Sequence, residues 1–127
     1  MIIKMTEEGF ETETGFGTLK IGAMEDGIRP NQLMLASIAG CSASVFRRIL
    51  TKQRIDIEDL TVEAEIVERI PEEANRIKKI HLHFIVKGSQ LNEEKLKRNL
   101  ELSRKHCPMA VSVEGRIDIE ESLEMIE

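Results

Sequence analysis

Apolar and polar residues alternate in two neighbouring stretches of the chain, 60–66 and 80–86. In the first stretch the alternate residues are threonine and glutamate, and in the second they are mostly histidine with lysine at the flanks. A turn-forming segment, 71–75, separates the two. This pattern predicts a β-hairpin with one buried face, in which the acidic outer face of one strand can pair with the basic outer face of the other.

A long segment from Pro30 to about Arg54 has the pattern of a helix. Proline is tolerated at the first helical position because the N–H it lacks has no partner there. The first half is apolar nearly all round, which predicts burial, whereas the second half is amphipathic. Small residues recur at steps of three and four and would let a second copy of this helix approach closely: Ala36, Ser37, Gly40, Cys41 and Ser44.

A second helix is predicted from Asn92, which is followed by Glu93 and Glu94. Asparagine is a favoured N-cap, and acidic residues stabilise the first turn. The helix must end before Pro108. One stripe along it carries Cys107 toward the interior: Leu96, Leu100, Ser103 and Cys107.

The two ends of the chain are predicted to add strands. Ile2 to Met5 and Phe10 to Ile21 indicate two or three strands, and Gly22 to Gly27 a loop with Met24 at its tip. A last strand is expected from about Val113 to Glu120, followed by a helical turn in the tail 121–127. The order of elements predicts one α+β domain over residues 1–127, with an antiparallel sheet and not a βαβ arrangement.

Composition narrows the possible functions. The net charge of −5 argues against nucleic-acid binding, which needs clustered Lys and Arg. No secretory signal and no apolar stretch of about 18 residues is recognisable, so we expect no membrane span and a cytoplasmic location. In a reducing compartment a disulfide is more often catalytic or sensing than structural.

The chain has two cysteines, Cys41 and Cys107, which are 66 positions apart. A reactive thiol needs access and a lowered pKa, whereas an isolated cysteine is more often a small buried apolar residue. His81 and His83 raise the possibility of zinc. Zinc ligands usually come in local pairs such as CxxC, and these histidines lie on the predicted solvent face, so we expect no metal and no cofactor.

The segment Pro30 to Cys41, Pro-x-Gln-Leu-x-Leu-Ala-Ser-x-Ala-Gly-Cys, is followed later by His106-Cys107-Pro108. These two motifs, in this order of elements, closely resemble the OsmC/Ohr family of osmotically inducible and organic-hydroperoxide-resistance proteins. The resemblance implies an intertwined homodimer in which antiparallel sheets wrap around long central helices.

The resemblance also implies a thiol-dependent peroxidase for organic hydroperoxides. Cys41 would become a sulfenic acid, Cys107 would form a disulfide with it, and a dithiol, often a lipoyl protein, would reduce that disulfide. The family's peroxidases pair a Glu before the first cysteine with an activating Arg. Here Asn31 and Gln32 are the residues ten and nine positions before Cys41, and Arg29 could supply the cation only if its loop folds over the thiol.

Two functions therefore remain open. One is a peroxidase that uses Cys41 and Cys107, with Gln32 and Arg29 as further site residues. The other is a dimer of the same fold that binds a small apolar ligand or senses oxidants with little or no turnover.

Overall fold

The computed structural model describes residues 1–22 and 27–127, so the predicted tip of the first loop, Met24, lies outside the described residues. The chain forms two compact units, Met1–Ala36 and Ser37–Glu127. The long helix α1 (Pro30–Lys52) begins in the first unit, and most of it belongs to the second.

The first unit contains a small antiparallel sheet. Its strands are β1 (Lys4–Met5), β2 (Phe10–Thr14) and β3 (Gly17–Ile21), paired in sequence order. The strands predicted near the N-terminus are therefore present, although β1 is only two residues long. Thr12 is the buried residue of β2.

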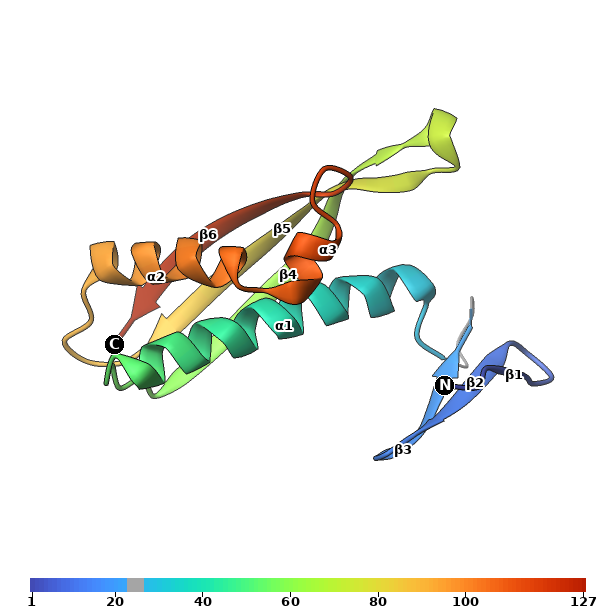
Figure 1. Cartoon of the computed structure of the whole chain (residues 1–127), viewed down its shortest axis with the longest axis horizontal. Coiled ribbons are helices and arrows are strands. Elements are labelled where there is room, and N and C mark those ends of the chain that lie inside the picture. The colour runs from blue at the N-terminus through green and yellow to red at the C-terminus, as the bar shows by residue number, and fades with distance from the viewer. Residues whose placement is uncertain (23–26) are drawn as a thin grey trace. The chain divides into compact units, whose positions relative to one another are not determined.

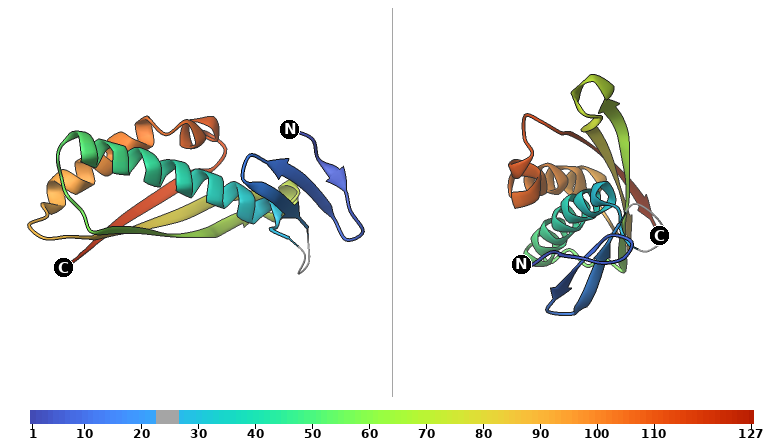
Figure 2. Two further views of the ribbon diagram at one scale, coloured as in Figure 1. Left: turned by 90° about the horizontal axis from the view of Figure 1, so that it is seen from below. Right: turned by 90° about the vertical axis from the view of Figure 1, so that its right-hand side faces the viewer.

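The second unit is a three-stranded sheet with helices on one face. Figures 1 and 2 show α1 and the C-terminal helices on the same side of the sheet, and the β4–β5 turn projecting beyond them. The sheet order is β4-β5-β6. The remaining elements of the unit are β4 (Asp59–Ile70), the 3-10 turn η1 (Pro71–Glu73), β5 (Arg76–Lys87), α2 (Glu93–Lys105), α3 (Pro108–Ser112) and β6 (Asp118–Ile126).

The core of the second unit is built from the residues that the alternation placed inward. The inner face of β5 is almost fully buried, and the rings of Phe84 and Phe46 of α1 pack in a T-shaped arrangement with centroids 5.5 Å apart. Asn92 caps α2 as predicted, because its side chain accepts a hydrogen bond from the Lys95 N–H at 2.9 Å. The buried residues of β5 and of the α2 stripe are Ile80, Leu82, Phe84, Val86, Leu96, Leu100, Ser103 and Cys107.

The α+β class is confirmed, but the last strand differs from the prediction. β6 begins at Asp118, extends to Ile126 and pairs with β5 in parallel, so the expected helical tail and the wholly antiparallel sheet are wrong. A parallel neighbour requires a crossover of a dozen or more residues, which α2 and α3 provide. Residues 113–117 instead form turns after α3, since the N–H groups of Arg116 and Ile117 both donate to the Val113 carbonyl.

By length and composition α1 could cross a membrane, with a mean hydropathy of 1.4 over an 18-residue window. The expectation that the chain has no apolar stretch of about 18 residues was therefore wrong. Core helices of soluble proteins pass the same criterion. In this fold the part of α1 that belongs to the second unit packs inside that unit. Its buried residues are Ile38, Ser42, Val45, Phe46 and Leu50.

Candidate functional site

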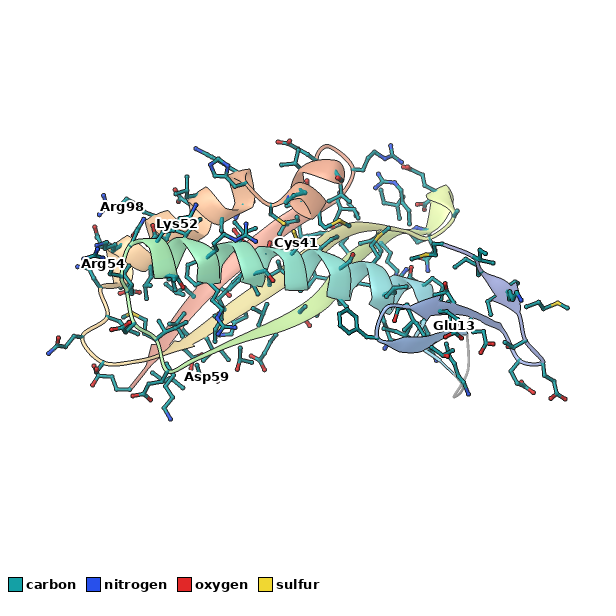
Figure 3. The ribbon with its side chains drawn as sticks, turned by 60° about the horizontal axis from the view of Figure 1, so that its bottom comes forward. Glu13, Cys41, Lys52, Arg54, Asp59 and Arg98 are labelled. Carbon is teal, nitrogen blue, oxygen red and sulfur yellow. The ribbon has the colours of Figure 1, made fainter. Side chains whose placement is uncertain are left out.

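The fold brings the two cysteines together within the second unit. Cys107 forms a small buried cluster with Val45 and Ala110, and Cys41 packs against that cluster. Figure 3 places Cys41 near the middle of α1. Cys107 is fully buried, whereas Cys41 is only half-buried. A small molecule can therefore reach Cys41 more readily than Cys107.

Cys107 is positioned by the break between α2 and α3. It is the N-cap of α3, and its sulfur accepts a hydrogen bond from the Ala110 N–H at 3.4 Å. Pro108 at the next position starts the new helix, as its fixed φ favours. The Ser42 hydroxyl, also fully buried, lies 3.6 Å from the same sulfur. Residues from α1 and α3 thus fix the orientation of the Cys107 side chain.

Burial raises the pKa of the Cys41 thiol above its ordinary value of 9.0. A hydrogen bond from the Met109 backbone N–H opposes this effect because it stabilises the thiolate. The neighbouring Cys107 thiol raises the Cys41 pKa further, and the positive charge of Arg48 lowers it. Cys107 thus lies close enough to Cys41 to act on its ionisation.

Arg29 and Gln32, the other two predicted site residues, lie in the first unit. The Gln32 side-chain oxygen accepts a hydrogen bond from the Arg29 backbone N–H at 3.2 Å. This contact is the glutamine half of a capping box at the start of α1. Both side chains are exposed. The structure thus gives Gln32 a role in helix capping, and their role in catalysis stays a prediction.

Three features of the site were missed in the sequence. Arg48, in the amphipathic half of the predicted helix, was not singled out, although its spacing of seven from Cys41 places both on one side of α1. Ser42 follows the candidate cysteine and was not singled out. The short helix α3 was not predicted, although a cysteine followed by proline is a plausible N-cap and first residue.

His81 and His83 lie on the sheet face opposite the helices and are about one-quarter exposed. Each contacts the Ser122 hydroxyl, at 2.7 Å and 2.6 Å, and each has a glutamate of β6 at its other ring nitrogen. They are thus less solvated than predicted. In residues 1–22 and 27–127, no three His, Cys, Asp or Glu side chains are grouped so as to hold a metal ion.

Comparison with known proteins agrees with this arrangement. A profile described as OsmC-like protein matches residues 23–122. Protein YhfA of Escherichia coli is 36% identical over 99 residues, which is 76% of this chain and 72% of YhfA. The organic hydroperoxide resistance protein OhrA of Bacillus subtilis is 26% identical over 103 residues, covering 81% and 72% of the two chains.

The fold is also that of a solved structure, a hypothetical protein from Aquifex aeolicus. The two share a TM-score of 0.87 at 24% identity, with 98% of this chain and 93% of the other covered. At that identity the likeness concerns the fold alone. The profile match, which spans most of the chain, and the similarity to YhfA establish that this protein belongs to the OsmC-like family.

Proposed function

We propose that the protein is a thiol-dependent peroxidase that reduces organic hydroperoxides through Cys41 and Cys107. The observation that carries this proposal is the contact between a half-buried Cys41 and a fully buried Cys107 in one unit. The similarity to OhrA, whose name refers to organic hydroperoxide resistance, supports the same class of substrate.

In the proposed reaction the Cys41 thiolate attacks the terminal oxygen of the hydroperoxide. The O–O bond breaks, an S–O bond forms, and the alkoxide takes up a proton to leave as an alcohol. Cys107 then attacks the sulfenic sulfur of Cys41, so that an S–S bond forms and the hydroxyl leaves as water. An external dithiol, for which a lipoyl group is our candidate, reduces this disulfide and is itself oxidised. We assign this cycle to the cytoplasm, where reductants keep thiols available.

The burial of Cys107 favours this division of roles. A resolving thiol that is shielded from solvent meets the sulfenic acid beside it before it meets a peroxide. The Met109 and Ala110 N–H groups donate to the two sulfurs and hold them at the same end of α3. No metal or cofactor enters the proposed cycle.

The test is the intact mass of the reduced protein after one equivalent of cumene hydroperoxide, followed by peptide mapping. We expect the loss of two hydrogens and a bridge between Cys41 and Cys107 within one chain. Both thiols remaining free after long exposure would contradict the proposal.

A second function is favoured by one observation, the raised pKa of Cys41. A thiol that is mostly protonated at neutral pH reacts slowly with peroxides. Under this alternative the protein binds a small apolar ligand or senses oxidants, with little or no turnover. Slow formation of the same bridge, without sustained peroxide consumption in the presence of dihydrolipoamide, would select it.

A further inference from the structure

A groove between α1 and the C-terminal end of α2 lies beside the cysteine cluster. Its volume is about 410 Å³. Two of its residues, Val45 and Ile49, also pack in the cluster with the two cysteines. The groove therefore shares these two side chains with the cluster that contains Cys41. Its complete lining is Val45, Arg48, Ile49, Lys52, Gln53, Leu102 and His106.

Helix geometry places Arg48 on the same side of α1 as Cys41. Seven residues fall only about 20° short of two full turns, so the two side chains leave the helix in nearly the same direction. Side chains of a helix also lean toward its N-terminus. The long Arg48 side chain therefore leans back toward Cys41, whereas that of a residue before the cysteine would lean away from it.

The charged side chains that line the groove are basic. On α1 they are Arg48 and, one turn farther, Lys52, and the His106 ring lies on the opposite wall. On the α3 side, the Met109 N–H and the Cys107 thiol face Cys41. Among the described residues that line the groove or the cluster there is no carboxylate. The buried acid of β6, Glu121, is paired with Arg104 at 2.7 Å.

Arg48 is available to act on the thiol. Its side chain is exposed, and within residues 1–22 and 27–127 no carboxylate lies within ion-pair distance of it. Its charge is therefore not neutralised by an internal partner. The second unit contains both Arg48 and Cys41, so this relation does not depend on the first unit.

We infer that Arg48, and not Arg29, is a positioning residue that stabilises the Cys41 thiolate and so sets its reactivity. The inference rests on the proposed function and names the cation that this function needs. Burial disfavours the thiolate, and the Arg48 charge offsets part of that penalty. Because Arg48 is exposed, the gain is modest and sensitive to salt.

The test is the rate at which neutral iodoacetamide alkylates Cys41 between pH 6 and 10, followed by peptide mapping, in reduced protein. We expect Arg48→Met to slow alkylation at neutral pH by about two- to fivefold and to shift the whole profile to higher pH. At high pH, where the thiol is ionised in both proteins, the rates should converge. Arg48→Lys should retain most of the wild-type rate.

Arg47 provides a matched control. It is also an exposed arginine, but it lies about 100° farther round the helix and lines a different groove. We expect Arg47→Met to leave the profile unchanged. An Arg48→Met profile that coincides with those of Arg47→Met and the wild type would overturn the inference.

Salt gives a second measurement that needs no variant. Raising KCl from about 0.02 M to about 0.5 M shortens the Debye length severalfold and should slow alkylation of the wild type at neutral pH. Arg48→Met should respond less. If circular dichroism shows that Arg48→Met does not fold, a wild-type rate independent of salt would overturn the inference. Alkylation needs no peroxide, so a shifted profile without peroxidase turnover would uphold the role of Arg48 and reject the proposed function.

Discussion

The two cysteines differ in exposure, and at the scale of single residues this difference decides what each can do. Cys41 is half-buried, whereas Cys107 has no exposed surface and its sulfur accepts hydrogen bonds from Ser42 and Ala110. A peroxide therefore meets Cys41 first. Exchanging the two thiols in the proposed cycle would require the buried sulfur to move outward against these contacts.

Replacing each cysteine by serine should block the proposed cycle at a different step. Cys41→Ser should abolish peroxide consumption, because a serine hydroxyl does not ionise in this range and cannot replace the nucleophile. Cys107→Ser should consume one equivalent and then stop at a Cys41 sulfenic acid, which dimedone traps with a defined mass increase. Full turnover by Cys41→Ser would show that the attacking thiol has been misassigned.

Glu121 offers a prediction about pH. Burial raises the pKa of this carboxyl above its ordinary value of 4.5, although its hydrogen bond with Arg104 partly offsets the effect. A group whose pKa is raised on folding stabilises the folded state below its unfolded pKa, and this contribution is lost as the pH rises through the folded value. The second carboxylate oxygen has no partner among the described residues.

Glu121→Gln removes this titration and keeps the shape of the side chain. We therefore expect the free energy of unfolding of the wild type, relative to that of the variant, to fall as the pH rises from about 4 toward neutrality. Urea unfolding of both proteins at a series of pH values measures the difference. A difference that stays constant or grows with pH would mean that the Arg104 ion pair outweighs burial.

Elements with a strong local pattern could be predicted from the sequence. The β4–β5 hairpin follows from strict alternation, and α2 follows from the Asn92 cap and an inward stripe that correctly buried Cys107. The strand β6 was mispredicted because Glu121 occupies an inward position, opposite Leu82 of β5. Its partner Arg104 lies on α2, and such a long-range ion pair leaves no local signal.

The link between β5 and β6 outside the core gives a prediction at the scale of elements. The Ser122 hydroxyl lies between His81 and His83, whose other ring nitrogens face Glu120 and Glu124. Ser122→Ala removes the shared atom and should lower the free energy of unfolding by about 0.5–1.5 kcal/mol. An exposed serine outside the helices and strands, Ser89, gives the control, and Ser89→Ala should change stability by less than about 0.5 kcal/mol.

A double-mutant cycle distinguishes the coupling between Ser122 and His81 from the separate effect of each substitution on stability. If Ser122 couples the two strands, Ser122→Ala and His81→Asn should be less than additive, because each removes part of the same network. Additive effects would mean that His81 and Ser122 stabilise the pairing of β5 and β6 independently of one another.

At the scale of the whole molecule, each unit exposes surface that a second copy of the chain could cover. In the first unit Met5 is 81% exposed and Phe16 is fully exposed, which is costly for apolar side chains in water. In the second unit the small-residue face of α1 includes Gly40 and Ser44, both exposed. We propose a homodimer on these grounds, as the resemblance of the sequence also implies.

Gly40→Arg tests the dimer without disturbing the single chain. A side chain at Gly40 meets no atom within 4 Å of its Cβ, so nothing inside the chain opposes the substitution. Replacing glycine within a helix should even add about 1 kcal/mol of intrinsic stability. A second helix packed on this face would instead be pushed away. We therefore expect association to weaken by at least about tenfold, that is by about 1.4 kcal/mol.

Sedimentation equilibrium measures this change, with Thr51→Arg, an exposed position near the C-terminal end of the same helix, as the control for added charge. Circular dichroism should show that both variants keep their helices. Because a dimer is stabilised by mass action, the unfolding midpoint of the wild type should rise with protein concentration, and that of Gly40→Arg should begin to rise only at higher concentrations. A Gly40→Arg protein that still associates like the wild type would mean that the copies meet elsewhere, and the small residues of α1 would then need another explanation.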